Sequence, residues 1–156
     1  MRTEIVVNTL LREAKKKEVT FTHLQIQKLL YFLHGHFLAK TGQPLIDEPF
    51  EAWQYGPVIN SLYYKLNQYG SAPVVSYIPS LDKTTGKEAF FVVNDNHKDF
   101  WDVLSLVWAE YANKDGLMLS ALSHKKGSPW DRAITRFEVI PNEVIREYFQ
   151  SQGVSA

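Results

Sequence analysis

One segment constrains the fold of this chain more than any other: the helix predicted for residues 22–41 is apolar on two opposite faces. At about 100° per residue, one face carries Ile26, Leu30, Leu33 and Phe37, and the other carries Leu24, Phe32 and Gly35. A helix that is apolar on both sides must be enclosed by other elements, because no single surface covers both faces. We therefore expect a mainly α fold, a compact helical domain around this central buried helix.

Both ends of the central helix carry recognisable signals. Thr22 and Gln25 have the spacing of a capping box, in which each side chain accepts a hydrogen bond from a free backbone N–H of the other. Gly42 and Pro44 follow the last turn. Glycine favours the left-handed conformation that ends a helix, and proline cannot continue the hydrogen-bond ladder.

Helical spacing of apolar residues recurs elsewhere along the chain. It predicts helices over residues 2–17, 57–70, 96–111 and 117–123, and a last helix that begins at Pro141. Asn96 is the expected N-cap of its helix. We expect residues from about 150 to 156 to fray. A chain of 156 residues has the length of one domain, so residues 1–156 are expected to form a single domain.

The pattern changes between residues 74 and 94. Residues 74–78 and 89–93 are β-branched and aromatic runs, and the stretch between them is polar and contains Gly86. This arrangement is typical of a β-hairpin. Because an isolated pair of strands is not stable in water, we expect a small hairpin that is inserted into the helical domain and packs against it.

An aromatic pair precedes a Gly-Pro break in the segment Trp53-Gln54-Tyr55-Gly56-Pro57. Gly56 is predicted to be an N-cap and Pro57 the first residue of the next helix, where its missing N–H costs nothing. Alternation along the preceding strand puts Trp53 and Tyr55 on the same side. They are therefore either both core or both part of a contact surface, and we favour a position beneath the central helix.

Composition excludes several classes of function. Basic and acidic residues number 17 each, so no overall field attracts nucleic acid or an anionic membrane; this counts against a dedicated nucleic-acid binder and leaves a local basic patch open. The chain has no cysteine, which excludes disulfides and thiolate metal sites and suits the cytoplasm. No run approaches the roughly 18 apolar residues of a membrane span, and the first residues do not have the pattern of a signal peptide.

The five histidines do not form a metal-binding pattern. His23 and His34 lie eleven residues apart on one helix, about 16 Å along its axis, too far to share an ion. No glycine-rich phosphate loop is present, and we expect neither a metal nor a cofactor. Ser123 and His124 are adjacent, but neighbouring side chains diverge at a helix end. We interpret His124 as a cap of its helix rather than a general base.

Lys28 is an unusual residue for the middle of the central helix, on a face that otherwise looks buried. A buried ammonium group is costly unless it has a partner. Its stem can lie along apolar surface with the charge in water, it can anchor an internal polar network, or its face can be open to a partner. Gln27 and His34 add polar groups on the same side.

Three stretches taken together resemble one known family. They contain QKLLY at residues 27–31, AWQYGPV at residues 52–58, and Ser123-His124 followed by Pro129-Trp130. This combination is similar to the Panacea domain of SocA-like and phage-associated GepA-like proteins, over nearly the whole chain. Ser123 stands where threonine is common in that family, which keeps the hydroxyl.

The resemblance implies an antitoxin of a toxin–antitoxin system, which neutralises a cognate protein toxin by direct binding and is not an enzyme. One alternative is a proteolytic adaptor that delivers its toxin to an ATP-dependent protease, and another is a small enzyme that uses His124 with Ser123 or Lys28. The candidate partner-binding residues are Gln27, Lys28, Tyr31, Trp53, Tyr55 and Trp130. The candidate structural residues of the motifs are Gly56, Pro57, His124 and Pro129.

Overall fold

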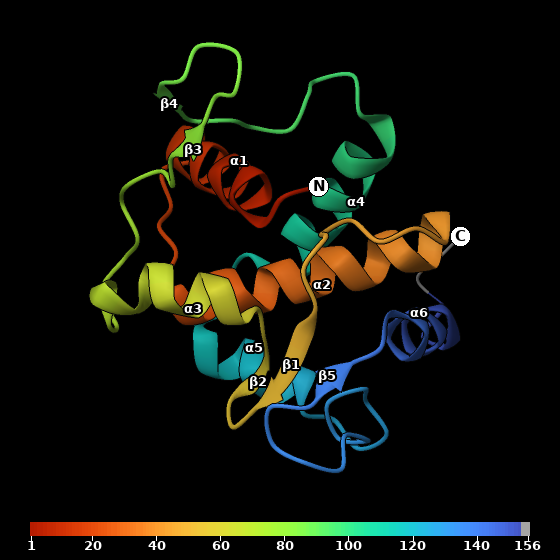
Figure 1. The fold of residues 1–156 in the computed structure, drawn as a ribbon. Coiled ribbons are helices and arrows are strands. Elements are labelled where there is room, and N and C mark those ends of the chain that lie inside the picture. Colours follow the sequence, from red (N-terminus) through yellow and green to blue (C-terminus); the bar gives the residue numbers. More distant parts are fainter. Residues whose placement is uncertain (154–156) are drawn as a thin grey trace.

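The structure is a computed structural model that describes residues 1–153, and its centre is the helix α2 (Figure 1). The helices are α1 (Thr3–Lys16), α2 (His23–Thr41), α3 (Asn60–Leu66), the short 3-10 helix η1 (Asn67–Tyr69), α4 (Lys98–Tyr111), α5 (Gly116–Ser123) and α6 (Asn142–Ser151). Helix α2 contacts each of the other five α-helices, and most of its residues are buried. The predicted mainly α fold around a central buried helix is confirmed.

Local chemistry fixes the ends of α2 as the sequence predicts. The Thr22 backbone N–H donates to Gln25 Oε1 at 2.8 Å, and the Gln25 N–H donates to Thr22 Oγ1, so the capping box is complete. Gly42 ends the helix in the left-handed conformation, with φ of 74°. The central helix therefore has the same bounds in the sequence pattern and in the structure.

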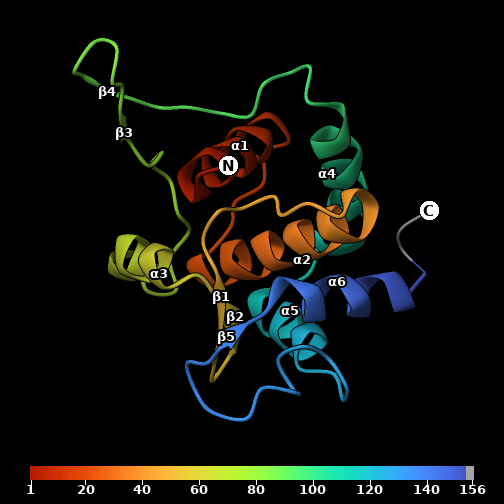
Figure 2. The ribbon, with the colours of Figure 1, turned by 45° about the vertical axis from the view of Figure 1, so that its right-hand side comes forward.

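Helix α2 lies between two groups of elements. Helix α1 lies on one side of it, whereas α5, α6 and a small sheet lie on the other (Figure 2). The approach of α6 depends on Gly35, because a Cβ at this position would lie 2.3 Å from the Phe149 ring. The Gly35 position thus explains why a glycine stands in the middle of a helix, where it is otherwise unfavourable.

The small sheet has three antiparallel strands in the order β2-β1-β5. They are β1 (Phe50–Trp53), β2 (Gly56–Val58) and β5 (Val139–Ile140), and β1 pairs with both neighbours. Strand β5 was not predicted, because two residues are too short to show an alternating pattern. It brings the chain before α6 back to the edge of β1.

The predicted helix start at Gly56 and Pro57 is wrong. Both residues lie in β2, Gly56 has a φ of 110°, and α3 begins only at Asn60 after the N-cap Ile59. The physical reason is that β1 offers a pairing partner, so that Trp53 lies opposite Gly56. A Gly-Pro pair suits a turn and an edge strand as well as a helix start.

A hairpin forms in the predicted region, but its strands are short and displaced: β3 (Ser80–Leu81) lies in the predicted turn rather than at residues 74–78, and it pairs with β4 (Glu88–Ala89). The flanking segments bond to helix α1 instead of to each other. Asn8 Nδ2 donates to the Ile78 carbonyl oxygen at 2.9 Å, and Asn8 Oδ1 accepts from the Ile78 N–H. Thr9 Oγ1 accepts from the Val93 N–H. These side chains satisfy backbone groups that a longer hairpin would have paired.

Three predicted helix ends shift by a few residues. His97, not Asn96, is the N-cap of α4, because its ring nitrogen accepts from the Phe100 N–H. Pro141 is the N-cap of α6 rather than its first residue, and α6 extends into the predicted frayed tail as far as Ser151. Residues 154–156 of that tail lie outside the described residues. In residues 1–153 no helix has both the length and the apolar composition of a membrane span.

Candidate functional site

A groove of about 450 Å³ opens beside the turn that joins β1 to β2. It is formed by the first half of α2, by α3 and by the β1–β2 hairpin. We call it the aromatic groove, and the lining residues that matter here are His23, Gln27, Trp53, Tyr55, Tyr63 and Phe137. No Lys, Arg, Asp or Glu of the described chain lines it.

The hairpin wall turns through Gln54 and Tyr55, which join Trp53 to Gly56. Gly56 takes the positive φ that completes the turn, a conformation that glycine adopts without strain. A Cβ at Gly56 would also lie 2.5 Å from Ser123 Oγ and 2.9 Å from Lys28 Cε. Both the backbone conformation and the close packing therefore require a glycine.

Two side chains of α2 hold the outer edge of β2. Lys28 Nζ donates to the Pro57 carbonyl oxygen at 2.8 Å. Gln27 Oε1 accepts from the Ile59 N–H at 3.0 Å, and Gln27 Nε2 donates to the Ile59 carbonyl oxygen. An edge strand presents unpaired backbone groups, and these side chains satisfy them from within the core.

Lys28 is fully buried, and none of the ion pairs within residues 1–153 includes it. Burial lowers the pKa of Lys28 to about 7. Of the three interpretations of this residue, the internal polar network is the one that agrees with these contacts. The hydrogen bond to Pro57 persists in either protonation state, because a neutral amine also donates.

A second set of side chains holds the turn from the other side. Ser120 Oγ donates to the Tyr55 carbonyl oxygen at 2.6 Å, and Trp130 Nε1 donates to the Trp53 carbonyl oxygen at 2.6 Å. His124 Nε2 lies 3.2 Å from the carbonyl oxygen of Gln54, the residue between Trp53 and Tyr55. We call Ser120, His124 and Trp130 the turn clamp, since three consecutive carbonyl groups each receive one side-chain donor.

The turn clamp is itself ordered by aromatic packing. The His124 ring meets the Trp130 ring edge to face, with centroids 3.9 Å apart, and Pro129 beside it is buried. Burial is the main cause that lowers the pKa of His124 below its usual value. The neutral ring has one N–H, which is used in the bond to the turn.

The turn clamp adds to the predicted role of His124. His124 is the C-cap residue of α5, as predicted, and its side chain also reaches the hairpin turn. Ser123 Oγ donates to the Ser120 carbonyl oxygen at 2.7 Å. Nucleophile activation needs a hydrogen bond from the hydroxyl to a base, and the Ser123 hydroxyl is directed elsewhere.

The exposed part of the aromatic groove consists of packed rings. Trp53 lies 4.8 Å from Tyr63 and 5.1 Å from Phe137 between ring centroids. Tyr55 is 59% exposed and Phe137 is 61% exposed. Burial, and secondarily the charge of Lys28, lower the pKa of His23 to about 4, so His23 is neutral at physiological pH. The groove therefore presents an uncharged, largely aromatic surface.

The structure separates the candidate partner-binding residues. Trp53 and Tyr55 both line the aromatic groove, so the expectation that the central helix covers them is wrong for Tyr55. Lys28 and Tyr31 are fully buried, which excludes them from a contact surface and corrects that prediction. Gln27 lines the groove, but its amide is bonded to the backbone of Ile59, the residue between β2 and α3.

Trp130 lines a neighbouring hollow rather than the groove, together with Ala52 and Arg136. The sequence did not indicate Phe137 as a groove residue, because it lies in no periodic segment. It did not indicate His23 either, because the spacing of the histidines argued only against a metal site. Tyr63 follows the AWQYGPV motif closely in the sequence, and that proximity was the available signal.

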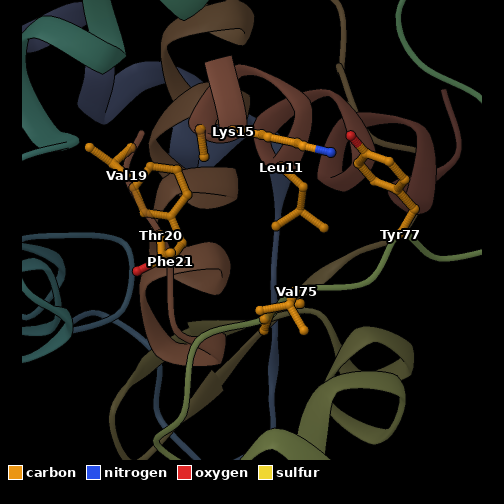
Figure 3. Close-up of a pocket in the computed structure, with 9 residues that line it drawn as sticks. Leu11, Lys15, Val19, Thr20, Phe21, Val75 and Tyr77 are labelled. Carbon is orange, nitrogen blue, oxygen red and sulfur yellow. The ribbon is translucent and has the colours of Figure 1, made fainter. Parts of the chain in front are cut away.

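Another cleft lies between the end of α1 and the segment that follows Pro73 (Figure 3). It measures about 200 Å³ and is mainly apolar, with Leu11, Val75 and Tyr77 among its lining residues and Lys15 at its border. It is less than half the volume of the aromatic groove. It also lacks the two sets of side chains that fix the groove wall, which favours the groove as the functional site.

Residues 26–131 match the family model described as "Antitoxin SocA-like, Panacea domain". The chain belongs to the SocA-like Panacea family. It is also 32% identical over 126 residues to Antitoxin SocA of Caulobacter vibrioides (strain NA1000 / CB15N). That alignment covers 81% of this chain and 66% of the length of the relative. No solved structure matches the chain significantly.

These matches confirm the resemblance found in the sequence. The matched family segment contains Lys28, the turn between β1 and β2, and the whole turn clamp, and it ends before Phe137. The family and the relative are both described as antitoxins.

Proposed function

We propose that this Panacea protein neutralises a cognate protein toxin by direct binding, and that the aromatic groove is its contact surface. The observation that carries the proposal is the exposure of Tyr55 and Phe137 at an uncharged groove that also contains Trp53. Tyrosine and tryptophan are enriched among the residues that dominate binding energy, and charged residues are depleted at interface centres.

The groove wall is held in one conformation before any partner arrives. Lys28 and Gln27 bond β2 from the side of α2, and the turn clamp bonds the turn from the side of α5. A surface that is already ordered loses less conformational entropy on binding. Rigid presentation of Tyr55 thus supports a role in tight protein recognition.

Phe137 adds a second argument from backbone strain. Its φ of 65° is uncommon for a residue with a side chain, and its ring is exposed to water despite being apolar. Residues held in sparsely populated conformations cost about 1–3 kcal/mol and cluster at functional sites. A partner that covers the Phe137 ring would gain the free energy of burying its apolar surface, a contribution separate from the backbone strain.

The proposal needs no metal and no cofactor, and its partner is a protein. A chain without cysteine agrees with a cytoplasmic complex. In the proteolytic-adaptor alternative the same groove would hold the toxin, and an ATP-dependent protease would bind elsewhere on the chain.

Co-expression with the neighbouring genes tests the antitoxin role. One neighbour should arrest growth when expressed alone, and co-expression of this chain should restore growth. Tyr55→Ala and Phe137→Ala should each weaken toxin binding about tenfold or more, the usual effect of losing a dominant aromatic contact. Phe90→Ala is the matched control, because Phe90 is 60% exposed but lies near Tyr77, away from the groove.

Two results would contradict the proposal at different levels. Failure of every neighbouring gene to arrest growth, or failure of this chain to rescue growth, would remove the antitoxin role itself. Rescue that persists unchanged in both groove variants would retain that role and reject the groove. Rescue that requires the protease, together with a shortened toxin half-life, would instead favour the adaptor alternative.

A further inference from the structure

A separate pocket of about 260 Å³ lies beside the second half of α2, where α4, α5 and α6 approach it. Its walls include Phe32 and His36 of α2, Tyr111 of α4, and Tyr148 and Phe149 of α6. One water molecule takes about 30 Å³ of liquid. The pocket therefore has room for much more than one bridging water.

Two residues of α2 that line this pocket carry buried polar atoms without a hydrogen-bond partner in residues 1–153. These atoms are the Tyr31 hydroxyl and His36 Nδ1. A buried polar group without a partner costs about 1–3 kcal/mol, and native proteins contain few of them. Both residues border the same pocket, which makes this pocket the candidate site for a bound molecule.

The hydroxyl groups at this pocket are hydrogen-bond donors. Burial raises the pKa of Tyr111 to about 12 and raises the pKa of Tyr148 above its usual value. Burial, with the nearby phenols of Tyr148 and Tyr111 adding to it, also raises the pKa of Tyr31 far above its usual range. All three phenols therefore stay protonated at neutral pH, and they lie close enough to act on one another's charge.

The charges at the pocket favour an anion over a cation. Lys114 and Lys125 line it, against a single carboxylate from Glu110. The His36 ring is neutral at physiological pH, because burial lowers the pKa of His36 to about 4. Its Nε2 lies 3.4 Å from the Tyr111 hydroxyl oxygen.

The remaining walls are flat and apolar. The rings of Phe32 and Tyr111 stack with centroids 4.1 Å apart and an angle of 8° between their planes. Phe149 stands against Phe32 at a steep angle, with 6.2 Å between the centroids. These surfaces suit a planar apolar group more than a fully hydrated ion.

We propose that this pocket binds a small organic carboxylate with a planar apolar group. The carboxylate oxygens accept hydrogen bonds from the hydroxyl groups of Tyr31, Tyr111 and Tyr148. The planar group packs against the rings of Phe32 and Phe149, and Lys125 supplies positive charge at the entrance. This site is distinct from the aromatic groove, and its existence does not depend on the antitoxin role.

Titration of the full chain with benzoate by calorimetry tests the proposal. Benzoate should bind saturably, and Tyr31→Phe should weaken that binding about tenfold or more, as expected for loss of a hydrogen bond to a charged group. The unliganded Tyr31→Phe variant should keep or raise its Tm, because it removes a hydroxyl without a partner. A lowered Tm of this variant would assign the hydroxyl a structural role and overturn its part in the site.

Two lysines that are adjacent in sequence supply a charge-matched control. Lys125→Gln should weaken benzoate binding several-fold, whereas Lys126→Gln should not, because Lys126 does not line the pocket. Equal effects of the two changes would indicate nonspecific attraction and overturn the site. Absence of saturable benzoate binding would overturn it directly. Equally strong binding of inorganic phosphate would show that the planar group contributes nothing, which contradicts the proposed ligand class.

Discussion

Lys28 joins the central helix to the edge of the small sheet through one hydrogen bond. The ammonium group lies in the core, and its partner is the Pro57 carbonyl oxygen rather than a carboxylate. A carbonyl oxygen offsets only part of the cost of removing a charge from water, so the neutral amine is favoured in the folded protein. The residue thus makes the stability of the groove wall sensitive to pH.

Replacement of Lys28 should change how stability depends on pH. The pKa of Lys28 is lower in the folded protein, about 7, than in the unfolded chain. Between these two values the unfolded chain binds more protons, so stability rises with pH. Chemical unfolding should show a gain of about 2 kcal/mol from pH 7 to pH 9 in the wild type. That gain should disappear in Lys28→Met.

An exposed lysine provides the control for this measurement. Lys16→Met should keep the rise of the wild type, because Lys16 is 60% exposed and lies at the end of α1. The same rise in Lys28→Met as in the wild type would show that some other group causes it. In that case Lys28 would be charged in the folded protein over the whole range.

Gly56 of the β1–β2 hairpin should be harder to replace than Gly86 of the β3–β4 hairpin. Gly56→Ala adds backbone strain at a φ of 110° and places a methyl group 2.5 Å from Ser123 Oγ. We expect a loss of about 3 kcal/mol in the free energy of unfolding. Gly86→Ala separates the two causes, since Gly86 has a φ of 72° but no atom within 4 Å of the added Cβ. It should cost about 1 kcal/mol. Equal losses in the two variants would mean that packing at Gly56 contributes nothing.

At the scale of elements, the turn clamp connects two motifs that are far apart in the sequence. The three donors come from α5 and the residues after it, and the three acceptors come from the turn between β1 and β2. This arrangement explains in physical terms why His124, Trp130 and AWQYGPV occur in one domain. Ser120, His124 and Trp130 supply the donors of one hydrogen-bonded unit, and the AWQYGPV segment supplies the acceptors.

Two substitutions of His124 should separate a positioning role from a catalytic one. His124→Ala removes the donor to the turn and the edge contact with Trp130, and it should cost about 1–2 kcal/mol of stability. Toxin binding should weaken in parallel. His124→Gln keeps an N–H donor and should retain most of the stability and of the neutralising activity. Complete loss of activity in a His124→Gln variant with unchanged Tm would contradict positioning and favour general acid–base chemistry.

The sequence predicted an element correctly where the contacts that fix its ends are local to that element. The capping box and Gly42 are local, so the bounds of α2 were accessible from the sequence. The hairpin strands were predicted too long and too far from the turn, because Asn8 and Thr9 of α1 bond the backbone at Ile78 and Val93. The pattern of residues 74–94 cannot indicate these contacts, because Asn8 and Thr9 lie 70 and 84 residues away from their partners in the sequence.

The same reasoning applies to the candidate site. The aromatic residues Trp53 and Tyr55 were predictable as a pair, because the motif places them together. Whether they face the core or solvent depends on the position of the turn. That position is set by tertiary contacts of Lys28 and the turn clamp, which the local sequence does not show. Phe137 reaches the groove only because β5 pairs with β1.

At the scale of the whole molecule, the charge of the chain and the lining of the aromatic groove both favour recognition through apolar contacts rather than through charge. The chain carries no net charge at pH 7, and the aromatic groove has no charged lining residue within the described chain. In the proposed complex, long-range attraction would therefore contribute little, and burial of aromatic surface would be the main source of affinity. Complexes formed in this way respond weakly to salt, whereas complexes steered by charge weaken steeply.

The affinity for the toxin should accordingly change little with ionic strength. We expect the Kd to vary less than about threefold between low salt and roughly 0.5 M sodium chloride, since salt screens only charge–charge attraction. A moderate gain in affinity at high sulfate would agree with apolar burial, because sulfate strengthens the hydrophobic effect. Calorimetric titrations of purified toxin at several salt concentrations measure this, with Phe137→Ala run in parallel. A steep loss of affinity with sodium chloride in both proteins would mean that a charged surface, rather than the aromatic groove, holds the toxin.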